Sequence, residues 1–207
     1  NLLEPEDFKS RESQYAETLE NERFFNKMSD EAKKKYMNDP LNFSMMMVSN
    51  GDADGLVAGA VTSTSDVLRS AIRIVGVTPL SKWVSSSFFM ISPKADAAYT
   101  FADCAVIPEP TSDQLASIAG ESSAIHRLLT GEEPQVAFLS FSTKGSANHR
   151  RVTHVKEAVK IFAEKYPNIL HDGELQLDSA LVPAVATSKA KDSPLAGNAS
   201  VLIFPSL

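Results

Sequence analysis

The stretch TSDQLASIAGESSAIHRLLTGEEPQVAFLSFSTKGSANHRRVTHVKEAVKIFAEKY, residues 111–166, decides the fold class. Thr111 and Gln114 have the spacing of a capping box, which predicts that a helix begins there. Residues 135–141 form a short apolar run, typical of a buried strand. The segment 149–166 reads as a second helix, because its apolar residues recur at helical spacing. Those inward positions are Val152, Val155, Val159 and Phe162.

The segments on both sides extend this alternation. Further strands are predicted at 83–91, 99–101, 105–107, 175–177 and 201–204, and a short helix near 178–187. Alternating strands and helices of this length indicate an α/β layered fold. The first part differs, because helices are predicted at 4–23, at 30–37 with Ser29 as its cap, and at 66–75. Residues 41–49, rich in methionine, are predicted as either a third helix or a buried segment. Residues 56–61 are predicted as either a short buried strand or a close-packed loop.

Bulk composition narrows the class of protein. The 207 residues are 43% apolar and 22% charged, with a net charge of −6. An acidic chain argues against nucleic acid or an anionic membrane as the main partner. Cys104 is the single cysteine, so no disulfide can form within the chain, which fits the cytoplasm. No apolar run approaches the roughly 20 residues that span a bilayer.

The first candidate site lies at 59–69, where small residues and hydroxyls precede a helix and Arg69 follows one turn later. Free amides at a helix start can hold an anion, and an arginine adds a charge-assisted bond to phosphate. The alternative is that Thr64 or Ser65 only caps the helix and Arg69 is solvated.

The second candidate is the turn at 139–147, where a strand leads through hydroxyls and Gly145 into a helix. Ligands of α/β folds bind at the carboxyl ends of strands, although this turn lacks the P-loop spacing. An ordinary strand-to-helix loop is the alternative. The acids of 172–178 are a third candidate, for a metal or for proton transfer. We expect no metal site, because the four histidines do not have ligand spacing, and no nucleophilic role for Cys104.

Taken together, these segments resemble the phosphate acetyl/butyryl transferase family, and most closely its acetyl-transferring members. The resemblance is carried by STSDVLR at 63–69, ADCAV at 102–106, LSFSTKGS at 139–146 and DGELQLD at 172–178. It is also carried by residues 53–61, 85–90, 110–115 and 193–197, in the family's order and spacing.

The resemblance implies a two-domain α/β fold of the isocitrate/isopropylmalate dehydrogenase type, with the active site between the domains. On this basis residues 1–79 are part of a first domain and 80–207 are a second domain, truncated at its C-terminus. It also implies reversible transfer of an acetyl group from acetyl-CoA to phosphate, giving CoA and acetyl phosphate. The transfer is direct within a ternary complex, in a cytoplasmic homodimer without a tightly bound cofactor.

Site residues carry over by position. Arg69 matches the arginine associated with phosphate or acetyl phosphate, and Arg23 matches the arginine associated with CoA. Ser63 and Thr64 match the anion-binding loop. The residues that we assign to substrate binding in the second candidate turn are Ser142, Thr143, Lys144 and Gly145. This sequence departs from the family at residues 24–26, which replace a more basic stretch, and at Ser70, which replaces a proline.

Both ends read as cuts through a larger fold. Family members carry roughly 60 more residues before this start and a C-terminal segment with a serine-arginine pair and an aspartate base. We therefore expect the 207-residue chain alone to be inactive. The alternatives are a butyryltransferase, or a regulatory module that senses acetyl-CoA, such as the C-terminal domain of malic enzymes.

Overall fold

The computed structural model describes residues 11–20, 22–78, 82–94 and 96–207. These form two compact units, one within residues 1–80 and one within 81–207. Within the described residues, no helix is both long and apolar enough to cross a membrane.

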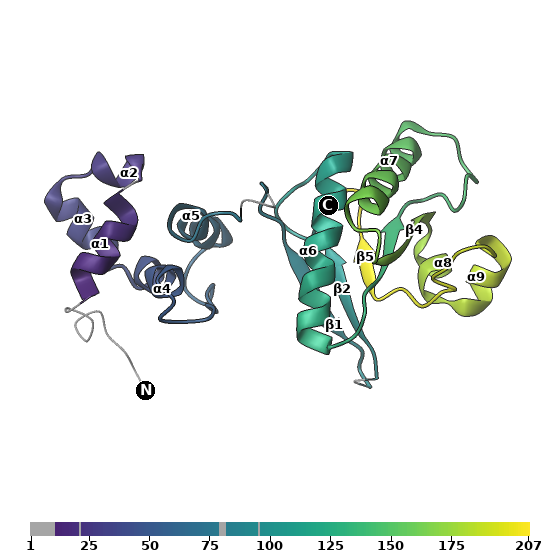
Figure 1. Cartoon of the computed structure of the whole chain (residues 1–207), viewed down its shortest axis with the longest axis horizontal. Coiled ribbons are helices and arrows are strands. Elements are labelled where there is room, and N and C mark those ends of the chain that lie inside the picture. Colours follow the sequence, from purple (N-terminus) through teal and green to yellow (C-terminus); the bar gives the residue numbers. More distant parts are fainter. Residues whose placement is uncertain (1–10, 21, 79–81, 95) are drawn as a thin grey trace. The chain divides into compact units, whose positions relative to one another are not determined.

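The first unit is helical (Figure 1). Its elements are α1 (Glu12–Glu20), α2 (Arg23–Asn26), α3 (Asp30–Met37), α4 (Pro40–Ser49) and α5 (Thr64–Ile74). Ser29 caps α3 by accepting the Ala32 N–H, as the sequence predicts, and Asp39 caps α4 ahead of Pro40. The predicted helix at 4–23 is divided, because α1 ends at Glu20; its residues before 11 lie outside the described part.

The core of the first unit is formed by apolar residues from all five helices. Its fully or nearly buried members include Tyr15, Leu19, Phe25, Met46 and Ile74. Residues 56–61 do not join it. Val57 and Val61 are almost fully exposed, at 101% and 96%, so the expectation of a buried strand or a close-packed loop was wrong. The cause is that neither valine packs against the core cluster of the described unit.

The second unit is built on a mixed sheet of five strands in the order β1-β2-β5-β3-β4. The strands are β1 (Ser87–Ile91), β2 (Ala98–Ala102), β3 (Gln135–Leu139), β4 (Leu170–Leu175) and β5 (Val201–Ile203). β1 runs antiparallel to β2, whereas the other neighbours are parallel. The α/β class is therefore confirmed.

The helices cover the sheet in two layers. α6 (Ser112–Thr130) and α7 (Arg150–Lys165) pack on the face that carries Val136 and Phe138. The opposite face, with Ala137 and Leu139, packs on α8 (Leu177–Leu181) and the segment around Leu195. α9 (Pro183–Lys189) follows α8 and lies next to it (Figure 1). Alternate residues of a strand face opposite sides, and β3 is buried on both.

Two predicted strands were misplaced. Residues 105–107 form a loop instead of a strand, because their N–H groups donate to the buried carboxylate of Asp103 at 2.9–3.2 Å. These donors are therefore not available to a sheet. The strand predicted at 175–177 is the end of β4, and Leu177 already begins α8. The sequence pattern missed most of β4, because buried polar residues, Asp172 and Glu174, interrupt its apolar run.

Candidate functional site

The start of α5 holds a polar network around Asp66. Ser63 caps the helix: its hydroxyl accepts the Asp66 N–H at 3.2 Å and donates to Asp66 Oδ2 at 2.7 Å. Arg69 Nη1 donates to Asp66 Oδ1 at 2.7 Å. The hydrogen bond from Ser63, then that from Arg69, lowers the pKa of Asp66 below its ordinary value. The cap is thus Ser63 instead of Thr64 or Ser65, and Thr64 is the first helical residue.

A cavity of about 300 Å³ opens beside this network. α5 and the residue before its cap contribute Thr62, Arg69 and Arg73, and the junction of α3 with α4 contributes Tyr36 and Asp39. Two guanidinium groups at one cavity, close to a helix N-terminus, form a surface suited to a small anion. The sequence reasoning missed Arg73, although it lies four residues after Arg69 and therefore on the same helix face.

Aromatic contacts hold Arg73 in place. Its guanidinium carbon lies 4.8 Å from the centroid of the Phe24 ring, which in turn contacts Tyr36 edge-on at 5.6 Å. Burial raises the pKa of Tyr36, opposed by the positive charge of Arg73, so its phenol stays protonated and able to donate. The Arg69–Asp66 pair differs, because both side chains are more than half exposed. Such a pair is weak and can be exchanged for a ligand.

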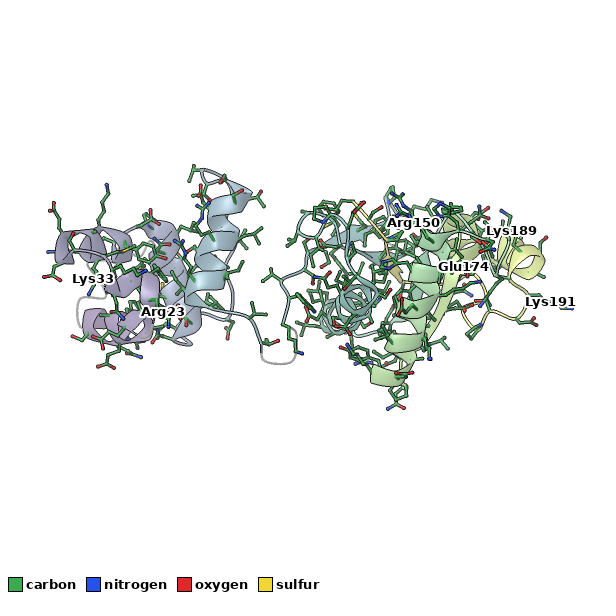
Figure 2. The ribbon with its side chains drawn as sticks, turned by 90° about the horizontal axis from the view of Figure 1, so that it is seen from above. Arg23, Lys33, Arg150, Glu174, Lys189 and Lys191 are labelled. Carbon is green, nitrogen blue, oxygen red and sulfur yellow. The ribbon has the colours of Figure 1, made fainter. Side chains whose placement is uncertain are left out.

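Arg23, the other predicted arginine, lies apart from this cavity. It is the first residue of α2, is exposed and does not line the cavity (Figure 2). Its role at CoA stays a prediction.

The turn after β3 is closed by a buried carboxylate. Glu174, 1% exposed, accepts the Gly145 N–H and the Ser142 hydroxyl, each at 2.8 Å, on Oε1. Lys156 Nζ lies 3.5 Å from its other oxygen. Burial alone would raise the pKa of Glu174, but the bonds from Gly145 and Ser142 outweigh it and hold this pKa below the ordinary value.

The remaining groups of this turn are paired as well. Lys144 forms an ion pair with the buried Asp172, and the Thr143 hydroxyl accepts the Gln176 N–H at 2.9 Å. An anion could use the donors of Ser142 and Gly145 only by displacing Glu174. The acids of 172–178 act here as internal partners, and no group of residues suited to a metal occurs among the described residues. Substrate binding by residues 142–145 therefore stays a prediction that this geometry does not favour.

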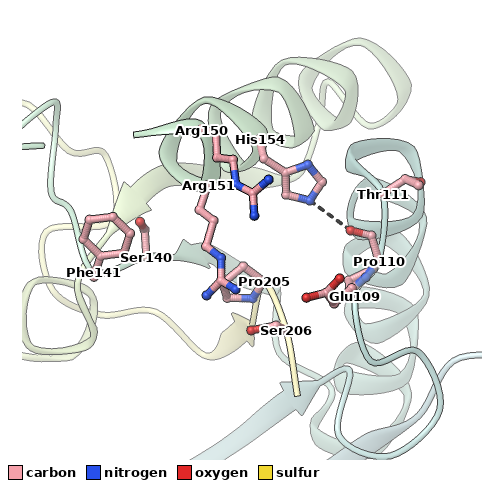
Figure 3. Close-up of a pocket in the computed structure, with 10 residues that line it drawn as sticks. All are labelled: Glu109, Pro110, Thr111, Ser140, Phe141, Arg150, Arg151, His154, Pro205 and Ser206. Carbon is pink, nitrogen blue, oxygen red and sulfur yellow. Dashed lines mark hydrogen bonds between the residues drawn. The ribbon is translucent and has the colours of Figure 1, made fainter. Parts of the chain in front are cut away.

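A larger cavity, which the sequence reasoning missed, lies at the carboxyl ends of β3 and β5. It has a volume of about 440 Å³. Ser140 and Phe141 follow β3, Pro205 follows β5, and Arg150 and Arg151 begin α7 (Figure 3). The only signal in the sequence was a pair of arginines directly after a strand-to-helix turn.

Comparison with known proteins identifies the family. The family model described as "Phosphate acetyl/butaryl transferase" matches residues 1–207. A phosphate acetyltransferase of Acetivibrio thermocellus is 45% identical over 197 residues, covering 93% of this chain and 59% of that protein.

Two solved structures agree with this result. The EutD phosphotransacetylase from Staphylococcus aureus superposes with a TM-score of 0.80 at 43% identity, covering 94% of this chain and 58% of that one. A phosphotransacetylase from Streptococcus pyogenes gives a TM-score of 0.82 at 38% identity, covering 97% of this chain and 59% of that one. The chain thus spans less than two thirds of the length of these relatives. It belongs to the phosphate acetyl/butyryl transferase family.

Proposed function

We propose that the full-length protein transfers an acetyl group reversibly between coenzyme A and inorganic phosphate. Family membership supports the reaction class, and the cavity beside Arg69 supports the place where the phosphoryl group binds. The finer architecture belongs to the same proposal: a two-domain fold of the isocitrate/isopropylmalate dehydrogenase type, in a cytoplasmic homodimer.

The proposed chemistry needs no covalent enzyme intermediate. The CoA thiolate forms a bond to the acyl carbon of acetyl phosphate, the bond from that carbon to the phosphate oxygen breaks, and phosphate leaves with the electron pair. The thiol proton goes to a base that the family resemblance places outside this chain. The enzyme contributes orientation and neutralisation of the phosphate charge.

Arg69 is the catalytic residue in this proposal, and its geometry is the observation that carries it. Its side chain is more than half exposed, lies at the first turns of α5, and shares a cavity with Arg73. A phosphate dianion at the start of α5 would replace the carboxylate of Asp66, which already occupies the place of an anion there. The exchange is easy because the existing ion pair is solvent-exposed.

The test is an assay on the full-length protein that follows thiol release from acetyl-CoA in the presence of phosphate. Arg69→Ala should lower turnover by about 10²- to 10³-fold, the usual cost of losing a group that stabilises developing charge. Lys34→Ala is the control, because it removes an exposed positive charge of the same unit outside the cavity. A stability measurement separates a loss of catalysis from a loss of folding. The free energy of unfolding of the Arg69→Ala variant should differ from that of the unaltered protein by less than about 0.5 kcal/mol.

Three outcomes would contradict the proposal. Unchanged turnover in Arg69→Ala would remove Arg69 from the site. Absence of thiol release, with acetyl-CoA still bound, would favour the regulatory module. A larger turnover with butyryl-CoA than with acetyl-CoA would instead identify a butyryltransferase.

A further inference from the structure

The start of α7 carries charges that oppose its own dipole. Arg150 and Arg151 are its first two residues, and its first turn contains no acid. The N-terminus of a helix bears partial positive charge, so two cations there destabilise the unliganded protein. Neither arginine makes an ion pair with any residue that the structure describes. Helix stability therefore does not explain this pair.

Both arginine side chains extend into the cavity of about 440 Å³ at the carboxyl ends of β3 and β5 (Figure 3). This volume is within the usual range for small-molecule sites, about 300–1,000 Å³. The carboxyl ends of parallel strands are also where α/β folds bind ligands. The position and the volume of this cavity are therefore typical of a ligand-binding site.

The walls of the cavity are held by hydrogen bonds without the arginines. His154 Nε2 lies 2.9 Å from the Pro110 carbonyl oxygen, which can only accept, so Nε2 carries the hydrogen. His154 Nδ1 lies 2.9 Å from the Ser112 hydroxyl. This histidine thereby joins α7 to the start of α6, where Thr111 and Gln114 form the capping box. The arginines are free to bind a ligand in a preformed frame.

The lining combines three kinds of group. The two guanidinium groups suit phosphate oxygens, which they can bind in a bidentate manner. Phe141, which is 56% exposed, and Pro110 and Pro205 offer apolar surface to a planar base. The carboxylate of Glu109, on the wall facing the arginines, can accept hydrogen bonds from a sugar hydroxyl or an amino group (Figure 3). A bare phosphate would use neither the apolar surface nor the Glu109 carboxylate.

We propose that this cavity binds a phosphorylated adenosine group, with Arg150 and Arg151 on its phosphates. Two sources supply that chemistry: the 3′-phosphoadenosine diphosphate end of CoA, or a free adenine nucleotide. Binding of CoA at this cavity rests on the proposed function, whereas binding of a free adenine nucleotide does not.

The test is isothermal titration calorimetry of the 207-residue chain at low salt with CoA, dephospho-CoA, ADP and inorganic phosphate. The double variant Arg150→Ala/Arg151→Ala should weaken binding of CoA or ADP by at least about tenfold. Lys160→Ala/Lys191→Ala is the charge-matched control, because both lysines are exposed, lie in the same unit and are outside the cavity lining. It should bind like the unaltered chain.

The ligand series separates the sources. CoA binding more tightly than dephospho-CoA and ADP supports the substrate end of CoA; ADP binding as tightly as CoA supports a free nucleotide. Failure of the unaltered chain to bind either, equal binding by the arginine double variant, or binding of inorganic phosphate as tight as that of CoA would overturn the proposal. Circular dichroism shows whether the double variant is folded; should it be unfolded, Arg150→Gln and Arg151→Gln replace it singly.

This measurement involves no turnover. A full-length protein that transfers acetyl groups while the cavity binds no nucleotide would refute this inference and leave the proposed function intact. The reverse result would refute only the proposed function.

Discussion

The turns at 62–66 and 142–147 look alike in sequence but differ in the burial of the acid that closes them. Each combines hydroxyls with a nearby cation, and in each a carboxylate accepts the hydrogen bonds. In the first turn that carboxylate is Asp66, whose side chain is 53% exposed. In the second turn it is Glu174, which is 1% exposed.

This difference decides what each turn can do. An exposed carboxylate is partly solvated and its ion pair is weak, so a ligand can replace it at little cost. A buried carboxylate that loses its partners keeps the full desolvation penalty, so its hydrogen bonds are structural. The comparison therefore favours the turn at 62–66 as the site for an anion, and the turn at 142–147 as scaffold.

The largest expected effect is on stability, when the two carboxylates are removed. Glu174→Ala should lower the unfolding free energy by about 3–5 kcal/mol, because Lys156 and the donors of Ser142 and Gly145 lose a buried partner. Asp66→Ala should lower it far less, because the Asp66–Arg69 pair is exposed to solvent. Urea unfolding followed by circular dichroism measures both, with Glu164→Ala, an exposed acid of α7, as control. Equal losses of unfolding free energy in Glu174→Ala and Asp66→Ala would contradict the distinction between the two turns.

A smaller effect is expected for the two hydroxyls. Ser142→Ala removes a donor to Glu174 and the acceptor of the Ala147 N–H, and should cost about 1–3 kcal/mol. Ser63→Ala removes only a helix cap and should cost about 1 kcal/mol. The same urea titrations would contradict the assignment if Ser63→Ala proved the more damaging of the two.

The smallest effect is the dependence of these differences on pH. The folded state lowers the pKa of Glu174 below its ordinary value of 4.5, so its contribution to stability is complete above that pH. The contribution is lost as pH falls through the lowered pKa of the folded state. Unfolding free energies of the unaltered chain and of Glu174→Gln should therefore converge in acid. The gap for Asp66→Asn should be smaller throughout, and a gap for Glu174→Gln that widens in acid would refute the assignment.

Much of the local structure could be predicted from the sequence. The capping box of Thr111 and Gln114, the cap at Ser29 and the apolar period of α7 all appear as expected. The start of α5 was anticipated only in part, because the cap is Ser63 instead of Thr64 or Ser65, and the contacts of Ser63 and Arg69 with Asp66 were not predicted. The strand at 105–107 failed because Asp103 takes its N–H groups, which residue types alone do not reveal.

Local sequence is enough to specify most of the helices and the capping box of α6, because caps, turns and helical periods depend on residues within about four positions of one another. Long-range packing, in contrast, brings Glu174 to the turn at 142–147, 29 residues from Gly145, and places Arg150 and Arg151 at one cavity with Pro205. The parallel pairing of β3 with β4 and β5 brings those distant positions to one edge of the sheet. Which strands become neighbours is set by burial of both faces of the whole sheet, a property that no short stretch of sequence contains.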